Sequence, residues 1–505
     1  MPETPTALPA HVHTFVIGAG FAGLCTAIKL QEAGERDFLV VERNGDVGGT
    51  WRDNTYPGAA CDVPSQLYSF SFAPNPEWSR SFSPQPEILA YLQRVAERSG
   101  VLDRFRFDTS LEEARWDDAE RRWHIRTSTG RLTADVVVSA AGALSDARLP
   151  DIDGIDSFDG EVFHSSQWRH DHDLTGKRVA VIGTGASAIQ IVPEIAGKVA
   201  HLDVYQRTAP HIIPRPDRAY TRLEKLAFRH VPGVQRAYRT AVYWARESFV
   251  PAFVWDSRIA APAKKAALMN IDKGISDPDL RAKVTPDFEL GCKRVLISND
   301  WYPALDREDV DLVTDRIEKI TPRGIVTQDG TERPIDVLIV ATGFLATDLP
   351  IARRIHGRGG VRLADHFTAH GMQAYKGATV HGFPNLFLVV GPNTGLGHSS
   401  MVFMIESQVA YVVDAHRRMR AADVLAVEPT QQVQDAWNAD LQRRMRRMVW
   451  STGGCSSWYL DAHGRNVTLW PRTTYKFRRL TARFDTENYD ATARVGADIG
   501  TEGLA

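Results

Sequence analysis

The hydrophobic pattern of the chain contains one arrangement twice. A short apolar run leads into a glycine-rich turn, a helix-like stretch and a second apolar run, first over residues 13–42 and again over residues 178–205. Near-continuous apolar runs of this length are typical of strands in parallel sheets. Each arrangement therefore predicts a β-α-β unit, and together they predict an α/β fold.

The pattern changes between and after these units. Residues 214–288 form helix-like segments rich in arginine and aromatic side chains, which predicts a helical insertion. Strand-like apolar runs return beyond this segment, and residues 433–449 place apolar side chains at helical spacing. The first residues and the polar stretch from residue 486 onward predict loose ends.

These features suggest a division into domains. We expect a disordered N-terminus at 1–12, a first dinucleotide-binding domain at 13–148 and 373–485, a second at 149–213 and 289–372, the helical insertion at 214–288 and a C-terminal tail at 486–505. The fold class is thus α/β, with two Rossmann-like dinucleotide-binding domains and a helical insertion.

Composition excludes several classes of protein. With 43% apolar and 24% charged residues, the 505-residue chain is neither disordered nor fibrous. The 60 basic and 62 acidic residues give a net charge of −2, so we expect no nucleic-acid partner. No apolar run approaches the ~18 residues of a membrane span, and the N-terminus lacks a signal-peptide pattern. We expect a cytoplasmic protein.

The four cysteines are Cys25, Cys61, Cys292 and Cys455. They lie far apart and form no C-x-x-C motif. We therefore expect free thiols in a reducing cytosol. No metal is expected.

The first glycine-rich turn contains Gly18, Gly20 and Gly23. Gly18 allows a tight turn, Gly20 lets backbone amides approach a pyrophosphate, and Gly23 lets helix and strand pack closely. The phosphate would then lie at a helix N-terminus, where free N–H groups favour an anion. Glu42, at the end of the second strand, can accept hydrogen bonds from an adenosine ribose. The register predicts a dinucleotide site, and the alternative is a glycine-rich surface turn.

The residues from Gly48 to Asp62 indicate which dinucleotide binds. Flavoprotein disulfide reductases with two nucleotide sites also have Gly-Gly-Thr after the acid, followed by a pair of redox cysteines. Here Trp51 stands in that region and Cys61 has no partner nearby. The pattern predicts FAD, with electrons passing to an acceptor other than a disulfide. Ala341-Thr342-Gly343, at the end of an apolar strand, resembles the link between nucleotide domains in this superfamily.

The second glycine-rich turn contains Gly183 and Gly185, followed by Ser187 and Ala188. Ala188 is a permitted small residue in the third position. The next strand leads to Arg207 and Thr208 and has no acid at the ribose position, while Asp203 lies within the strand. Because a guanidinium binds a 2′-phosphate and an acid would repel it, this turn predicts NADPH and not NADH.

A fingerprint precedes the second turn: Phe158, Gly160, His164 and Trp168 at fixed spacing. With the fixed positions from Gly48 to Asp62, it makes the chain resemble the flavin-dependent Baeyer–Villiger monooxygenases over about residues 11–484. The family has proline or aspartate next, where this chain has Arg169. For His164 and Trp168 two interpretations stay open, a linker between domains and direct contact with substrate.

The resemblance implies roles for particular residues. Arg294 corresponds to the catalytic arginine, Lys293 to a lysine that binds the 2′-phosphate, and Asp62 to an acid near that arginine. It implies a flavin C4a-peroxide that attacks a ketone, with the arginine stabilising the negative charge. The alternatives are a solvated basic pair and an ordinary turn acid. The residues expected at the flavin are Gly49, Thr50, Trp51, Asp62 and Tyr68.

Two further stretches resemble parts of the family. The loop from Gly391 to His398, which contains Asn393, resembles a flavin-contacting loop, and the alternative is an ordinary strand-to-helix turn. Trp458 lies in a segment that resembles one bordering the substrate pocket, and the alternative is a core aromatic.

The sequence therefore predicts an FAD- and NADPH-dependent monooxygenase. It would insert one atom of O2 next to a ketone carbonyl to give an ester or lactone, as a monomer or homodimer. One alternative is a flavin monooxygenase that oxygenates an amine or thioether, which the departure at Arg169 keeps open. Another is a two-nucleotide reductase or redox-sensing binder that passes electrons to a quinone or partner protein.

Overall fold

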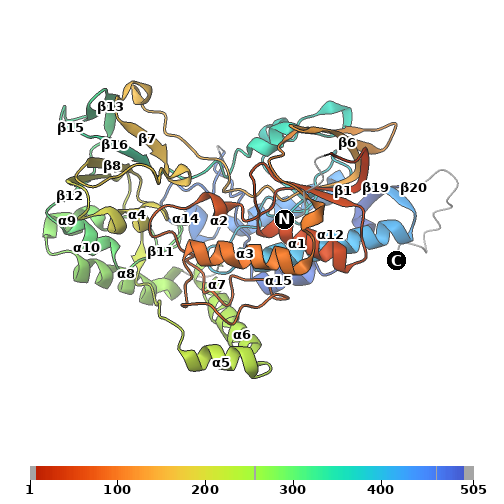
Figure 1. The fold of residues 1–505 in the computed structure, drawn as a ribbon, viewed down its shortest axis with the longest axis horizontal. Helices are drawn as coiled ribbons and strands as arrows, with labels where there is room; N and C mark the ends of the chain where they lie inside the picture. Colours follow the sequence, from red (N-terminus) through yellow and green to blue (C-terminus); the bar gives the residue numbers. More distant parts are fainter. Residues whose placement is uncertain (1–6, 255–256, 462, 494–505) are drawn as a thin grey trace.

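The computed structural model describes residues 7–254, 257–461 and 463–493. It shows two α/β domains side by side and an arm of helices that projects from them (Figure 1). Within the described residues, every helix is too short or too polar to cross a bilayer.

The first domain is built on an eight-stranded sheet. Its parallel part joins β1 (His11–Ile17), β2 (Phe38–Val41), β3 (Phe105–Arg106), β6 (Gly130–Ser139) and β18 (Leu386–Leu388). An antiparallel extension joins β6 to β5 (Arg122–Thr127) and β4 (Leu111–Asp117). Apolar side chains of α1 (Phe21–Glu32), α3 (Gln85–Ser99) and α12 (Met401–Ala421) cover one face of the sheet.

The second domain has a five-stranded parallel sheet in the order β12-β9-β8-β16-β7. Its strands are β7 (Glu161–His164), β8 (Arg178–Ile182), β9 (His201–Tyr205), β12 (Val310–Val313) and β16 (Val337–Val340). α4 (Ala188–Ile195) and α10 (Trp301–Leu305) pack their apolar side chains against it. A small antiparallel sheet adds β13 (Ile317–Thr321), β14 (Gly324–Thr327) and β15 (Glu332–Pro334).

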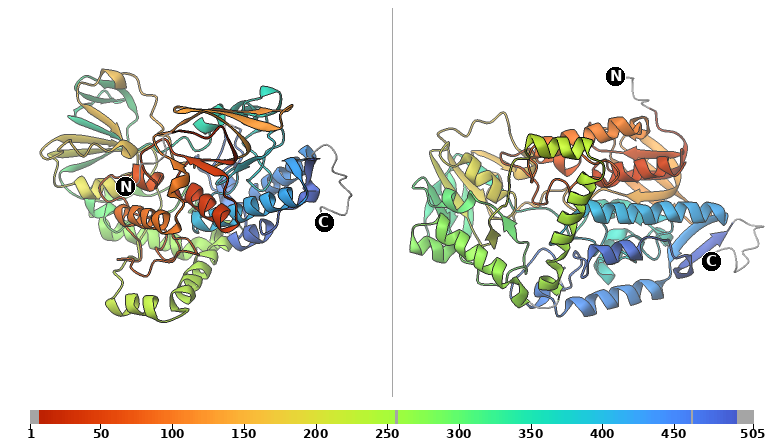
Figure 2. Two further views of the ribbon diagram at one scale, coloured as in Figure 1. Left: turned by 45° about the vertical axis from the view of Figure 1, so that its right-hand side comes forward. Right: turned by 90° about the horizontal axis from the view of Figure 1, so that it is seen from below.

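The segment expected as a helical insertion holds α5 (Arg222–His230), α6 (Val234–Glu247), α7 (Val250–Val254), α8 (Ala261–Gly274) and α9 (Pro278–Val284). α5 and α6 form the projecting arm, while α8 and α9 lie under the second sheet (Figures 1 and 2).

The chain crosses between the two domains at two neighbouring segments. Ala147 and Phe344 form an antiparallel bridge. The N–H of Arg148 donates to the carbonyl of Gly343 over 2.8 Å, and the N–H of Leu345 donates to Asp146 over 3.0 Å. The two crossing segments are therefore held together by backbone hydrogen bonds, which position one domain against the other.

Several expected boundaries differ from the structure. β17 (Ile355–His356) pairs with β4, so the chain re-enters the first domain well before residue 373, because its apolar residues complete that core. Leu8 packs on the same core and β1 begins at His11, so residues 7–12 are ordered by contacts that the local pattern does not reveal.

The C-terminal prediction also needs correction. β20 (Tyr489–Ala493) pairs with β19 (Val424–Pro429), so the expected loose tail does not begin at residue 486. Residues 494–505 and 1–6 lie outside the described part. The helix expected over 433–449 is α13 (Gln431–Met445), and a separate short helix, α14 (Val449–Thr452), follows it.

Candidate active site

The first glycine turn brings two pieces of backbone close together. A Cβ on Gly23 would lie 1.8 Å from the carbonyl oxygen of Gly18, and one on Gly49 would lie 3.0 Å from Cα of Gly20. Gly18 also has φ +99°. Gly20 caps α1 without a side-chain hydrogen bond, so the first N–H groups of the helix are open to an anion. A dinucleotide pyrophosphate fits this cradle.

Glu42 is tied into the same turn. Its Oε2 accepts from the N–H of Ala19 over 2.9 Å, while Oε1 accepts from the N–H of Asn44 over 3.0 Å and from Arg52 over 3.2 Å. The carboxylate is buried. Glu42 therefore fixes the shape of the turn. Arg52, which the sequence pattern did not single out, holds it in place.

Trp51 and Tyr68 form a pair beside this turn. The indole N–H of Trp51 donates to the Tyr68 hydroxyl over 3.1 Å, and the rings meet edge to face with centroids 5.6 Å apart. Thr50 begins the short helix α2 (Thr50–Asp53) and is exposed. Gly49 and Tyr68, two of the residues predicted near the flavin, thus lie beside this glycine turn, Tyr68 with its ring centroid 5.2 Å from that of Phe21.

The second glycine turn has the same construction. Gly183 has φ +118°, and a Cβ there would lie 2.5 Å from the carbonyl oxygen of Ala341. A Cβ on Gly185 would meet no atom of the described residues within 4 Å, its own chain neighbours aside. Ser187 caps α4 without a side-chain hydrogen bond, and Ala188 is fully buried. This turn can also receive a pyrophosphate.

Two cations lie near each other beyond this turn. Burial and the charge of Arg207 both lower the pKa of the Lys293 ammonium, which places the two groups in one neighbourhood. Arg207 is exposed, and Lys293 lies over the ring of Phe288 with Nζ 5.0 Å from its centroid. Asp203 is turned away, paired with Arg333 over 2.8 Å. Two cations without an acid at the strand end suit a 2′-phosphate.

Arg294 and Asp62 form an ion pair. Nε and one terminal nitrogen of Arg294 donate to the same oxygen, Oδ2 of Asp62, over 2.9 and 2.5 Å. The other terminal nitrogen lies 3.5 Å from the carbonyl oxygen of Leu396. Burial alone would raise the pKa of Asp62, but the charge and hydrogen bonds of Arg294 outweigh it and lower that pKa. The charge of Asp62 in turn raises the pKa of Arg294. Both groups are therefore ionised.

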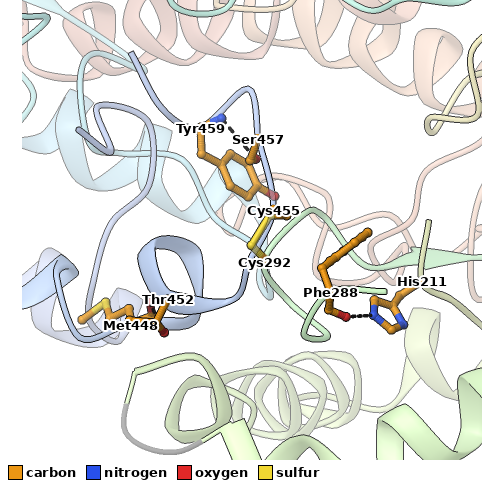
Figure 3. Close-up of a disulfide and its surroundings, with 8 residues drawn as sticks. All are labelled: His211, Phe288, Cys292, Met448, Thr452, Cys455, Ser457 and Tyr459. Carbon is orange, nitrogen blue, oxygen red and sulfur yellow. Dashed lines mark hydrogen bonds between the residues drawn. A yellow bond between two sulfur atoms is a disulfide. The ribbon is translucent and has the colours of Figure 1, made fainter. Parts of the chain in front are cut away.

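A disulfide joins the Arg294 loop to a distant segment. Cys292 and Cys455 are bonded across 163 residues, with Cα atoms 6.1 Å apart (Figure 3). The N–H of Glu289 donates to the carbonyl of Gly453 over 3.0 Å beside it. The prediction of free thiols is wrong for these two cysteines, because the fold brings together residues that are distant in sequence. Cys25 and Cys61 are free and buried.

The fingerprint residues hold the domain crossing. Nδ1 of His164 accepts from the N–H of Ser166 over 3.2 Å, so Nε2 donates to the carbonyl of Gly343 at 3.0 Å. Burial lowers the pKa of His164, which keeps the ring neutral. A Cβ on Gly160 would lie 2.4 Å from the carbonyl oxygen of Asp336. These contacts correspond to the linker interpretation of His164.

The remaining fingerprint side chains pack within the second domain. Trp168 meets Phe163 edge to face with centroids 5.2 Å apart, and Phe158 packs on a smaller apolar cluster. Arg169, the departure from the family pattern, is exposed and pairs with Asp171 over 2.9 Å. The departure therefore lies on the surface.

Comparison with known proteins agrees with the two dinucleotide sites and with the family resemblance. A family model described as pyridine nucleotide-disulphide oxidoreductase matches residues 15–223, which contain both glycine turns. A Baeyer–Villiger monooxygenase of Streptomyces coelicolor is 49% identical over 493 residues, covering 97% of this chain and 95% of that protein. Another, from Pseudomonas aeruginosa, is 49% identical over 506 residues, covering 99% and 96%. The chain belongs to the Baeyer–Villiger monooxygenases.

A solved structure extends the comparison to the fold. The crystal structure of OTEMO in complex with FAD and NADP superposes with a TM-score of 0.86 at 29% identity, covering 95% of this chain and 99% of that one. The predicted fold class, two Rossmann-like domains in an α/β protein, is confirmed. The prediction of an FAD- and NADPH-dependent Baeyer–Villiger monooxygenase that acts on a ketone is likewise confirmed by family membership.

In this Baeyer–Villiger monooxygenase, the side chain of Asn393 donates hydrogen bonds to the protein backbone. Its amide donates to the carbonyls of Asn466 over 2.8 Å and Leu469 over 3.2 Å, and its φ is +57°. The amide nitrogen of Asn393 is therefore used to hold the loop against residues 466–469. Trp458 is 42% exposed and packs on the buried ring of Tyr459 with centroids 4.6 Å apart. Thr208 uses its carbonyl to accept from Thr184 over 3.3 Å.

One contact between the domains was missed at the level of sequence. Tyr56 donates to Oε1 of Gln190 on α4 over 3.1 Å, and Nε2 of Gln190 donates to the carbonyl of Ala60 over 3.0 Å. A Cβ on Gly58 would lie 2.6 Å from the carbonyl oxygen of Gln190. Tyr56 and Gly58 are fixed positions of the pattern from Gly48 to Asp62, and they were the only sequence features that could have indicated this contact. Gln190 belongs to no recognisable motif.

Proposed function

We propose that this enzyme holds FAD at the Gly18 turn and NADPH at the Gly183 turn as it converts a ketone into an ester or lactone. The ion pair of Arg294 and Asp62 carries the proposal, because it holds a charged guanidinium in one orientation and joins it to the segment Gly48 to Asp62, which follows the first glycine turn. The complex of OTEMO with FAD and NADP supports the choice of cofactors.

The phosphates would be bound by backbone and by cations. Free N–H groups at the start of α1, next to Gly18 and Gly20, would bind the FAD pyrophosphate, and those around Gly183 and Gly185 the NADPH pyrophosphate. Arg207 and Lys293 would bind the 2′-phosphate. When bound, NADPH supplies electrons and FAD passes them to dioxygen.

Arg294 would act on the ketone. Negative charge develops on the carbonyl oxygen as the carbonyl carbon is attacked, and a guanidinium that is permanently charged stabilises it. A donor of this kind contributes ~3–4 kcal/mol where it has been measured. Asp62 accepts two of its donors and so keeps the guanidinium in one orientation. The second terminal nitrogen of Arg294 does not contact Asp62. It makes only a long, weak contact of 3.5 Å with the carbonyl oxygen of Leu396.

The experiment incubates the purified enzyme with NADPH and a panel of ketones, with a thioether beside them. The expected product is an ester or lactone that is heavier than the ketone by one oxygen atom, found by mass spectrometry. Sulfoxide formation with no ester from any ketone would contradict the proposal and favour the heteroatom alternative. A cytoplasmic location, the absence of a nucleic-acid partner and a monomeric or homodimeric state stay predictions from the sequence.

A further inference from the structure

A second arginine, Arg246, lies in the region of the Arg294–Asp62 pair. Its neighbour Glu247 contacts His398 over 3.2 Å, and Leu396 of the same loop lies 3.5 Å from Arg294. Arg246 is the penultimate residue of α6, in the arm of helices, and its charge contributes to the field that lowers the pKa of Asp62. Its Nε is buried and has no hydrogen-bond partner in the described part of the chain. Among the residues that the structure describes, no acid or carbonyl pairs with Arg246, and its guanidinium lies 5.8 Å from the ring centroid of Phe249.

The end of α6 is firmly anchored, which fixes the position of Arg246. The neighbouring Glu247 accepts from the N–H and hydroxyl of Thr474 over 2.9 and 2.7 Å, and it contacts His398 at 3.2 Å. Tyr243 stacks on Phe403 with centroids 4.9 Å apart and lies 3.1 Å from the Thr474 hydroxyl. Adjacent helix residues point in different directions, so Glu247 is not a partner for Arg246.

The acceptors near Arg246 are already used by other groups. Asp62 carries one negative charge, and two nitrogens of Arg294 donate to its Oδ2. Arg215, a further cation near Asp62, lies at 3.4 and 3.3 Å from the carbonyls of Cys61 and Phe82. Arg246 has no such acceptor within the described part of the chain. Arg246 is half-buried and its Nε is buried, so an anion that binds there would supply the acceptor that this nitrogen lacks among the described residues.

We propose that Arg246 binds a carboxylate on the substrate, so that this enzyme prefers ketones that carry a carboxylate. The inference rests on the proposed function, in which Arg294 faces the ketone carbonyl. A guanidinium binds a carboxylate through two parallel N–H donors. One unmatched positive charge suits a carboxylate better than a phosphate monoester, and the cofactor phosphates have sites of their own at the glycine turns and at Arg207 with Lys293.

The first experiment compares linear oxo acids with their methyl esters in the flavin-loaded enzyme. In this series the ketone lies progressively further from the carboxylate. With the carboxylate at Arg246 and the carbonyl at Arg294, one distance between the two groups should fit best. We expect kcat/KM for the best acid to exceed that for its methyl ester at least tenfold. In Arg246→Gln the KM for the acid should rise at least tenfold, while kcat/KM for the methyl ester and the rate of flavin reduction by NADPH stay within twofold. Arg246→Lys should recover part of the preference.

Matched controls make the test decisive. Arg236 is an exposed arginine on the same helix, and Arg236→Gln should leave the preference for acids intact. An acid preference of less than twofold in the wild type would overturn the proposal. So would an equal loss for acid and ester in Arg246→Gln, which would indicate a structural role, or a selective rise in the KM for NADPH, which would indicate a cofactor contact.

A binding measurement separates this inference from the proposed function. A saturated carboxylic acid of the best length, which has no ketone to react, is titrated into the flavin-loaded enzyme by calorimetry. Binding that weakens at least tenfold in Arg246→Gln supports the carboxylate site even if no ketone is oxygenated, in which case only the proposed function fails. Equal binding by wild type and variant overturns the carboxylate site even if neutral ketones are converted.

Discussion

Arg294 and Asp62 are separated by 232 residues in the sequence, yet two nitrogens of the arginine donate to one oxygen of the aspartate, over 2.9 and 2.5 Å. The arginine comes from the loop after the helical insertion, and the aspartate follows the flavin-side glycine turn. Their pairing joins the two dinucleotide-binding domains at the point where the chemistry is expected.

Replacing Arg294 tests its role in oxygenation. We expect Arg294→Ala to bind FAD and NADPH as the wild type does, yet to form ester from a ketone ~100–1000-fold more slowly, as when one stabilising donor is removed. Flavin absorbance measures binding, and product mass measures oxygenation. Arg294→Lys, which keeps the charge but not the planar fork, should retain more activity than Arg294→Ala. Normal ketone turnover by the alanine variant would refute the role.

Replacing Asp62 tests the ion pair through pH. The pKa of Asp62 is lower in the folded protein than in the unfolded chain, so its contribution to stability is present above the unfolded value and is lost as pH falls through the folded value. Asp62→Asn should therefore melt about 2 °C lower than wild type at pH 7. The difference should shrink as pH falls below about 4. Melting curves from pH 3 to 8 measure it, and a difference that is constant with pH would contradict the ion-pair account.

We expect Arg207 and Lys293 to decide the choice of nicotinamide cofactor. Each of Arg207→Ala and Lys293→Ala removes a cation from the expected 2′-phosphate site, which should raise the KM for NADPH ~10–100-fold. NADH carries no 2′-phosphate, so its kinetic constants should change little. Steady-state kinetics with both cofactors measure the ratio. If wild-type enzyme prefers NADH tenfold or more, the assignment of the Gly183 turn to NADPH is wrong.

The Cys292–Cys455 disulfide should stabilise the fold around Arg294. A cross-link over a long loop contributes ~2–4 kcal/mol to the free energy of unfolding. Reduction by a dithiol should therefore lower the melting temperature of the wild type and increase hydrogen exchange at residues 453–460. The double variant with both cysteines replaced by serine is the control, since a dithiol should not change its melting temperature. Two additional reactive thiols in native, unreduced protein would show that the bond is absent in solution.

Local pattern predicted the central elements well. β8 begins and β9 ends at the bounds of the second predicted β-α-β unit, residues 178–205, and α1 begins directly after Gly20. These elements are readable because strand and helix periodicity are properties of consecutive residues. The hydrophobic pattern did not predict the antiparallel pair β4 and β5, whose residues mix polar and apolar side chains, or the long helix α12, which is buried over much of its surface within the first domain.

Short patterns were enough to establish the two glycine turns, the absence of an acid after the second, and the residues that resemble a Baeyer–Villiger monooxygenase. The chemistry of each follows from residue type and spacing along the chain. The folded chain was needed to show that Asp62 is the partner of Arg294, that Cys292 is bonded to Cys455 and that Gln190 joins the domains. It was also needed to show that the buried Nε of Arg246 lacks a partner among the residues that the structure describes. These relationships depend on how distant segments pack, and packing brings together residues whose separation in sequence carries no signal.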